Sequence, residues 1–484
     1  MDIAELFGDV ALAFLLLGFL ILAGKIVRVW VPGLRKLFMP VSLIAGAIGM
    51  LLGPQVLGAM TGDEGWFADG LFPENVRAVW GELPGLLISV VFAAMFIGKP
   101  IPSLGLMWQR SGPQVMFGHT LAWGQYVIGI SLAMFVLYPI WGTSPLAGAL
   151  LEMSLVGGHG TVAGMQGAFE ELGFPEGTDL GLGLATIGIL AGVIIGTVLV
   201  NWAARTGRVD LSPADEPGDV EQEKLADFDE KEDVERSIPE PEVPGAEGKS
   251  EGEDKPVDPL SVHVALLGLA VGIGWVLQQA LLWVESVAWA SWWDLDLFRY
   301  LPLFPLAMIG AMILQVVLEW IGYDDHVDRR LVNRISGASL DMIIVSALAT
   351  LSLAALGAHW GPLLVLAVAG ITWNVVGFLV LAPRMIPKHW FARGAGDFGQ
   401  SIGMAALGLL LIRLADPQDK ARASERFGYK QVLFEPLVGG GLFTAASVPL
   451  LAQFGAGPML IVVTVVTLGF LVGGLWLFKG EAER

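Results

Sequence analysis

A run of glycines flanked by polar side chains is the first part of this 484-residue chain that could do chemistry. Three glycines within four residues disfavour a regular helix, because each costs about 1 kcal/mol relative to alanine. They expose backbone N–H groups, which can bind a carboxylate, and carbonyl groups, which can bind a cation such as Na⁺. The predicted substrate ligands here are Ser154, Gly158, His159, Gly160 and Thr161, and Gly157 is a predicted cation ligand.

This glycine run also has plainer explanations. Small residues are common where two helices pack closely, so the glycines could serve packing alone. The imidazole of His159 could brace the loop as readily as touch a ligand. The residue types alone leave both interpretations open.

A second glycine-rich stretch, residues 394–403, contains a carboxylate. Asp397 is expected inside this stretch, where an ionised carboxylate is costly unless it is paired or bound to a cation. Asp397 is therefore the main predicted Na⁺ ligand, although it could instead be an interfacial residue near Arg393. Gly399 and Ser346 are the further predicted cation ligands, and the neutral polar residues Gln400, Ser401 and Asn374 are predicted substrate ligands.

The other polar residues of the chain give weaker indications of a functional site. Glu435 precedes Pro436 at an expected helix start, where a carboxylate suits the positive end of the helix dipole. The chain has no cysteine, and its histidines lack the spacing of a metal site. It also lacks the Walker A motif of an ATP-driven pump. We therefore expect neither an enzyme nor a catalytic residue.

The composition indicates which elements must position these residues. Hydrophobic residues make up 54% of the chain and charged residues 15%, against about 25% in an average soluble protein. The mean hydropathy of +0.66 excludes an ordinary cytosolic enzyme, a disulfide-linked secreted module and a nucleic-acid binder. Because about 20 apolar residues span a bilayer, we expect membrane helices at 7–29, 40–60, 84–98, 115–139, 179–204, 261–283, 300–320, 337–357, 362–383, 432–452 and 457–478.

The two glycine-rich stretches lie in segments of a different kind. Residues 146–170 and 394–414 are apolar but broken by glycines and polar residues. Irregular backbone at membrane depth persists only where protein or water satisfies it, so we expect two re-entrant segments. Five spans precede the middle of the chain, an odd number, so the second half begins from the opposite face. The expected fold class is an all-α polytopic membrane protein with two inverted repeats of about five helices, each with a re-entrant hairpin, plus one extra C-terminal helix.

Residues 205–260 differ from the rest of the chain in composition. Nineteen acidic and five basic residues lie between residues 209 and 259, so most of the net charge of −19 belongs to this segment. With few apolar side chains it is expected to be a disordered cytoplasmic linker. Basic residues of the short loops fall on the same side, which predicts an outside N-terminus and a cytoplasmic C-terminus. The expected domains are repeats 1–204 and 261–453, the linker 205–260, and the extra helix with its tail, 454–484.

On these residues the chain resembles the sodium/glutamate symporter family of bacteria. The resemblance covers Gly157–Thr161 and Ala185–Gly196, and returns at Asp397–Gly399 and Glu435–Gly439. It implies two inverted five-helix repeats in a homodimer. It also implies Na⁺-coupled uptake of glutamate across the bacterial inner membrane, with an elevator-type movement of a transport domain against a scaffold.

Two departures from the family pattern leave alternatives open. The chain reads Ile402–Ala406 where the family continues through Thr-Pro-Thr, and it carries Thr444 near a position where the family has an aspartate. One alternative is a proton-coupled transporter, or one for a hydroxycarboxylate or another amino acid. Another is a membrane sensor whose acidic linker recruits a partner. The expected partners are a small anionic amino acid or carboxylate, Na⁺ as the coupling ion, the lipid bilayer and a second copy of the chain, with no nucleic acid.

Overall fold

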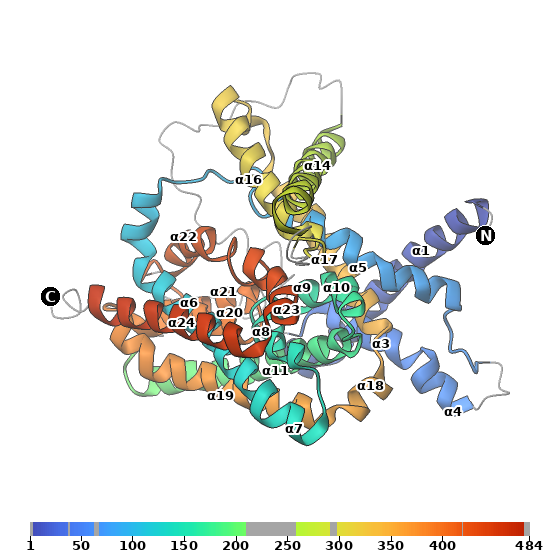
Figure 1. Ribbon diagram of the computed structural model, residues 1–484, viewed down its shortest axis with the longest axis horizontal. Helices are drawn as coiled ribbons and strands as arrows, with labels where there is room; N and C mark the ends of the chain where they lie inside the picture. Colours follow the sequence, from blue (N-terminus) through green and yellow to red (C-terminus); the bar gives the residue numbers. More distant parts are fainter. Residues whose placement is uncertain are drawn as a thin grey trace.

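The computed structural model describes residues 3–36, 39–61, 67–209, 258–290, 298–418 and 420–478. Every regular element in these ranges is a helix (Figure 1). Ten stretches among them are long and apolar enough to cross a bilayer: Phe7–Trp30, Val41–Thr61, Glu74–Ala94, Leu104–Trp141, Glu176–Arg205, Pro259–Ala288, Leu303–Ile321, Arg329–Ala349, Trp360–Met385 and Ala456–Leu477. The expectation of an all-helical polytopic membrane protein is confirmed.

Two of the expected spans begin about ten residues earlier than hydropathy predicts. The span expected at 84–98 is α5, Glu74–Ala94, and that expected at 337–357 is α17, Arg329–Ala349. The early residues are charged but have partners or cover a core. In α5, the buried Trp80 indole donates to the Ala13 carbonyl at 3.0 Å. In α17, Arg329 donates to the Ile97 carbonyl at 2.7 Å, just beyond the end of α5.

The single helix expected at 432–452 is wrong. The chain forms α22, Ala423–Phe434, and α23, Leu442–Phe454, with residues 435–441 between them. Gly439 and Gly440 have φ angles of 75° and 101°, a backbone conformation that strains any residue with a Cβ. Hydropathy does not register this turn, because glycine is close to neutral on that scale.

Six long helices pack mainly on one another and are called here the first helix set: α1 (Ile3–Trp30), α3 (Val41–Leu51), α5, α14 (Pro259–Glu285), α16 (Leu303–Ile321) and α17. The largest contacts within it join α14 to α16, α5 to α17, and α3 to both α17 and α1. The first helix set fills the upper and right parts of Figure 1. Small residues allow the closest approach, since a Cβ on Gly274 of α14 would lie 2.5 Å from the Ala307 nitrogen of α16.

The remaining long helices form the second helix set: α6 (Leu104–Leu132), α11 (Glu176–Arg205), α19 (Trp360–Met385), α22, α23 and α24 (Ala456–Leu477). The first broken segment, residues 145–171, belongs to it and contains η3 (Pro145–Ala149), α8 (Leu150–Leu155), α9 (Gly158–Gly164) and α10 (Gln166–Glu171). The second broken segment, residues 390–415, contains α20 (Trp390–Ile402) and α21 (Ala405–Ala415). Helices α24, α22 and α19 all pack on α6, so α6 forms the centre of this set.

Short helices connect these elements: α2 (Pro32–Lys36), η1 (Pro54–Gly58), α4 (Ala59–Thr61), η2 (Ala133–Leu137), α7 (Tyr138–Trp141), η4 (Ser286–Ala290), η5 (Asp324–His326) and α18 (Leu353–Ala358). The linker expected at 205–260 lies mostly outside the described residues, which omit 210–257. The described chain resumes at Asp258, whose carboxylate caps α14 by accepting from the Ser261 N–H at 3.1 Å.

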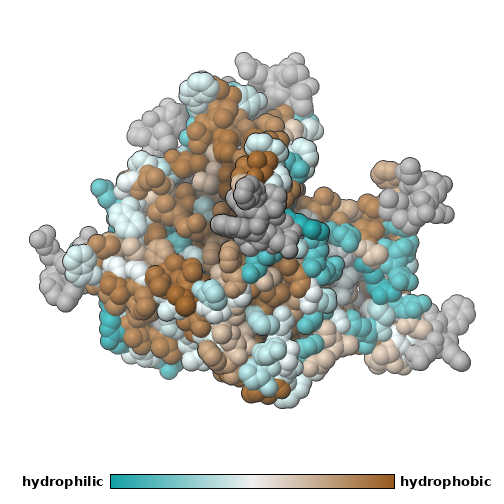
Figure 2. All heavy atoms as spheres, viewed as in Figure 1, coloured by the Kyte–Doolittle hydropathy of each residue, from teal (hydrophilic) through white to brown (hydrophobic). Residues whose placement is uncertain are grey.

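Large apolar side chains face outward on the peripheral helices. Trp476 of α24 is 76% exposed, Ile461 of the same helix 67%, and Phe7 of α1 70%. Figure 2 shows hydrophobic residues over broad parts of the visible face. An apolar surface of this extent is unfavourable in water and suited to lipid. The core itself lies between the helices and around the two broken segments.

Candidate functional site

The first broken segment changes direction at two glycines. Helix α8 ends at Leu155 and α9 begins at Gly158, whose φ of 76° requires a residue without a Cβ. The Thr161 hydroxyl donates to the Gly157 carbonyl at 2.9 Å and so holds the turn from inside α9. The break therefore exposes helix ends in the interior of the molecule.

The second broken segment is a tight antiparallel pair. A Cβ on Gly399 of α20 would lie 2.7 Å from the Gly408 Cα of α21, so neither helix tolerates a side chain at this contact. Helix α20 ends at Ile402, and the extended Met404 leads into α21. The end of α20 is held from outside, because the amide groups of Gln125 and Asn374 donate to the Ser401 carbonyl at 2.7 and 2.9 Å.

The two breaks, which are the points at which α8 gives way to α9 and α20 to α21, lie next to each other. The nearest atom to a Cβ built on Gly158 is the carbonyl oxygen of Gly403, at 3.7 Å. Segments that are far apart in the sequence therefore come together at their points of interruption. Both breaks line a cavity of about 310 Å³, a size typical of small-molecule sites.

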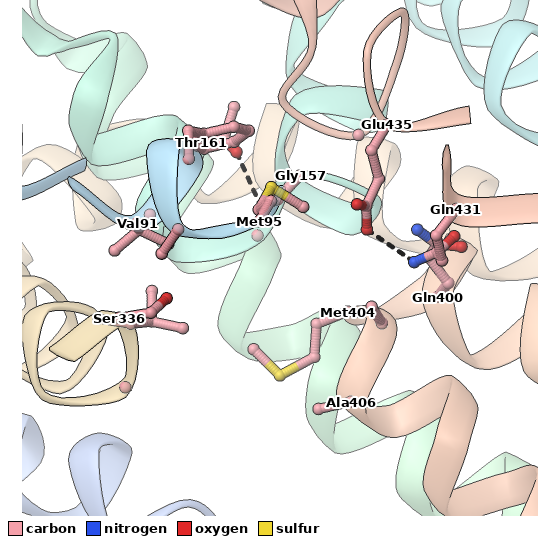
Figure 3. A pocket seen from close by; sticks show the side chains of 18 of the residues that line it. Val91, Met95, Gly157, Thr161, Ser336, Gln400, Met404, Ala406, Gln431 and Glu435 are labelled. Carbon is pink, nitrogen blue, oxygen red and sulfur yellow. Dashed lines mark hydrogen bonds between the residues drawn. The ribbon is translucent and has the colours of Figure 1, made fainter. Parts of the chain in front are cut away.

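The wall of this cavity comes from both helix sets. The first helix set contributes the end of α5 and the first half of α17, including Val91, Met95 and Ser336. The second contributes the two breaks and α22. In Figure 3 the side chains of Thr161, Glu435 and Met404 approach the cavity from separate elements. The cavity thus lies where the two helix sets face each other.

The cavity wall carries charges of both signs. Lys99, Arg329 and Glu435 all line it. Glu435 accepts a hydrogen bond from the Gln431 amide at 2.7 Å, which Figure 3 marks with a dashed line. Two cations and one carboxylate in the wall of a small, mostly apolar cavity suit a ligand with more than one carboxylate and an ammonium group.

Six of the twelve predicted site residues line the cavity: Gly157, Gly158, His159, Gly160, Thr161 and Gln400. The imidazole of His159 also contacts a neighbour, since its Nε2 lies 2.9 Å from the Thr186 hydroxyl of α11. This contact agrees equally with a role of His159 in bracing the loop and with a role in ligand binding.

The other six lie behind the wall: Ser154, Ser346, Asn374, Asp397, Gly399 and Ser401. Asn374 and Ser401 hold the end of α20, and Gly399 serves the contact of α20 with α21. The Ser346 hydroxyl donates to the Ile343 carbonyl of its own helix at 3.1 Å. The Ser154 hydroxyl is buried and finds no hydrogen-bond partner within the described residues.

Asp397 has a cationic partner that the sequence did not indicate. Its Oδ1 lies 3.1 Å from the Lys430 Nζ of α22, and both side chains are fully buried. The same ammonium donates to the Gln400 side-chain oxygen. Lys430 was missed because hydropathy placed it just before an expected helix at 432, in what would have been a loop.

A second buried carboxylate was also missed. Glu152 of α8 accepts hydrogen bonds from the Tyr126 hydroxyl, from the Gly439 N–H at 2.7 Å and from the Thr444 hydroxyl at 3.0 Å. Its position in an apolar helix was the available signal. Glu435 was noticed, but its expected place at a helix start is wrong: it follows the end of α22 and lines the cavity.

Comparisons with known proteins add independent findings. A family model described as sodium/glutamate symporter matches residues 113–241, a range that includes most of α6, the first broken segment and α11. Two relatives named sodium/glutamate symporter, from Escherichia coli (strain K12) and Shigella flexneri, are each 26% identical over 321 residues. The match covers 65% of this chain and 68% of each relative. The family resemblance drawn from the sequence is confirmed, and the relatives carry the name of transporters, not of enzymes.

Proposed function

Because the chain is a relative of the sodium/glutamate symporters, we propose that it is a secondary transporter that couples Na⁺ entry to uptake of glutamate or a similar small anionic amino acid. Its location is the plasma membrane of a bacterium. The observation that carries the proposal is the meeting of two interrupted helical segments at one charged cavity. Binding sites formed by interrupted helices near the middle of the membrane are typical of secondary transporters.

Different residues of the cavity wall recognise different groups of the substrate. Lys99 and Arg329 attract the two carboxylates of glutamate, and Glu435 attracts its ammonium group. The exposed backbone at Gly158–Thr161 and the Gln400 amide complete the substrate site. Carbonyl oxygens at the ends of α8 and α20 provide the oxygen ligands that suit Na⁺, the co-transported cation.

Two inverted repeats are supported by a regular exchange of helix neighbours. In the first half α1 packs on α3, and in the second half α14 packs on α16. Likewise α3 packs on α17 while α16 packs on α5. The pairs α5–α17 and α6–α19 join equivalent helices of the two halves. We infer repeats 1–204 and 261–453, with the broken segments as re-entrant hairpins and α24 as an addition packed on α6.

An elevator-type movement is supported by the position of the cavity. Its wall is shared between the first helix set, which would be the scaffold, and the second, which would carry the substrate. Substrate and Na⁺ would be linked because they stabilise the same closed arrangement of the two breaks. The scaffold would also form the homodimer, with the N-terminus outside and the linker and C-terminus in the cytoplasm.

The test is uptake of labelled glutamate by purified protein in liposomes. We expect accumulation when Na⁺ is higher outside and none when Na⁺ is equal on both sides. Accumulation that follows an imposed proton gradient and ignores Na⁺ would contradict Na⁺ coupling. A thermal-shift series with glutamate, aspartate, citrate and malate identifies the substrate, since a true ligand at 100 times its Kd stabilises by about 2.7 kcal/mol.

A further inference from the structure

The ion pair behind the cavity wall resembles a cation site that is already occupied. The Lys430 ammonium lies 3.1 Å from the Asp397 carboxylate and donates to the Gln400 side-chain oxygen. The Phe434 ring lies beneath it, with the ring centre 3.5 Å from Nζ. Carboxylate oxygen, amide oxygen and an aromatic face together replace the water that a buried ammonium loses.

The pair is closely packed on the side that faces α6. Gly118 of α6 lies directly against it: a Cβ at this position would be 2.7 Å from the Lys430 Cε, 3.1 Å from its Nζ and 3.2 Å from the Asp397 Oδ1. A Na⁺ ion at the carboxylate would also face the ammonium at close range, where the low polarity of the interior makes the repulsion strong. Lys430 and Na⁺ therefore exclude each other at Asp397.

The pair is one layer from the cavity. Gln400, which accepts from Lys430, lines the cavity wall, as do Phe427 and Gln431 on the same helix as Lys430. A change of charge at the pair is therefore felt at the cavity through Gln400. A buried ion pair contributes little stability compared with apolar residues of the same volume. This favours a function over a purely structural role.

We propose, on the basis of the proposed function, that Lys430 is a tethered cation that permanently takes the place of one coupling Na⁺ at Asp397. The coupling Na⁺ then binds elsewhere, at the exposed carbonyl groups of the two breaks. Neutralising Lys430 while keeping Asp397 creates an empty site with one negative charge and oxygen ligands. Such a site recruits an external cation.

The experiment compares Lys430→Met with the double variant Lys430→Met/Asp397→Asn in liposomes. The ratio of ²²Na⁺ to glutamate taken up is measured for each. We expect Lys430→Met to carry one more Na⁺ per glutamate than the unmodified protein, and the double variant to return to the unmodified ratio. If Lys430→Met folds poorly, Lys430→Gln keeps an amide donor toward Asp397 and takes its place.

A second measurement does not depend on transport. The melting temperature of each purified variant is followed from choline chloride to NaCl at constant ionic strength. Lys430→Met should gain an additional Na⁺-dependent rise, beyond the rise of the unmodified protein and of the double variant, in which Na⁺ binds only at the two breaks. Absence of this rise, together with an unmodified flux ratio, would overturn the proposal. If Lys430→Met gains the rise but the unmodified protein shows no Na⁺-driven glutamate uptake, the proposed function is overturned, and only the exclusion of Na⁺ from Asp397 by Lys430 stands.

Discussion

Two fully buried carboxylates, one in each broken segment, are stabilised in different ways. Glu152, in the first, accepts hydrogen bonds from two hydroxyl groups and one backbone N–H. Among the residues that the structure describes, no cationic side chain forms an ion pair with it. Asp397, in the second, is paired with the Lys430 ammonium. Neutral donors therefore satisfy one carboxylate and a fixed positive charge satisfies the other.

This difference indicates that Glu152 joins neighbouring elements through hydrogen bonds, whereas Asp397 balances a buried positive charge. The partners of Glu152 come from α6, from α23 and from the glycine turn before α23, so its hydrogen bonds tie the first broken segment to both. All three donors are uncharged, so none of them requires a negative charge as its partner. The Lys430 ammonium has no second carboxylate within hydrogen-bonding distance among the described residues, so its charge depends on Asp397.

The largest expected effect is that of Asp397→Asn. In the absence of Na⁺ it should lower the free energy of unfolding by about 3–5 kcal/mol, because a buried ammonium loses its counter-charge. Adding Lys430→Met should recover most of this loss, since both groups are then neutral. Denaturation of the detergent-purified protein in choline chloride measures both values.

Glu425→Gln is the matched control for this pair. Glu425 lies on the same helix, α22, but its partner Arg110 is 43% exposed. Its loss should cost less than about 1 kcal/mol, as for other exposed ion pairs. Losses from Asp397→Asn and Lys430→Met that simply add in the double variant would mean that the two groups do not interact.

Next in size is Gly399→Ala. The new Cβ would lie 2.7 Å from backbone atoms of Gly408, so α20 and α21 must separate, at about 1–3 kcal/mol. The matched control in the other broken segment is Gly167→Ala, where a Cβ meets nothing within 4 Å. That variant should gain up to about 1 kcal/mol from helix propensity. Thermal unfolding of the two variants side by side tests the contrast, and equal melting temperatures would contradict the packing role of Gly399.

The smallest expected effect is that of Glu152→Gln. The amide keeps one acceptor for the Gly439 N–H, and the Tyr126 hydroxyl can turn to accept instead of donate. The net loss is therefore about one hydrogen bond, or about 1 kcal/mol. Glu171→Gln, on the exposed surface of α10, is the control and should change nothing measurable. A loss as large as that of Asp397→Asn would show that Glu152 balances a charge, and the contrast between the two carboxylates would fail.

Much of the fold could be predicted because membrane insertion depends on local composition. Ten apolar stretches of the described chain correspond to ten of the eleven predicted spans. The two breaks were also predictable, since clustered glycines weaken any helix in which they occur. The failures have local causes: charged first turns in α5 and α17 hid their true starts, and the near-neutral hydropathy of Gly439–Gly441 hid the turn between α22 and α23.

The candidate site was predicted only in part. The glycine run at 157–161 and Gln400 line the cavity, and their role as ligands stays a prediction. Lys430 and Glu152 were not identified, because their importance depends on what surrounds them. A lysine near a helix end is usually solvated, and only the approach of α20 and α6 makes Lys430 a buried cation.

The amino-acid sequence by itself determined which segments enter the membrane and where two of them are interrupted, since both depend on residues close together in the chain. The tertiary structure decided that the interruptions meet, that charged residues of both helix sets share one cavity wall, and that Asp397 pairs with a lysine. These are contacts between residues far apart in the sequence. Their geometry depends on the packing of whole helices, which no local pattern of residue types contains.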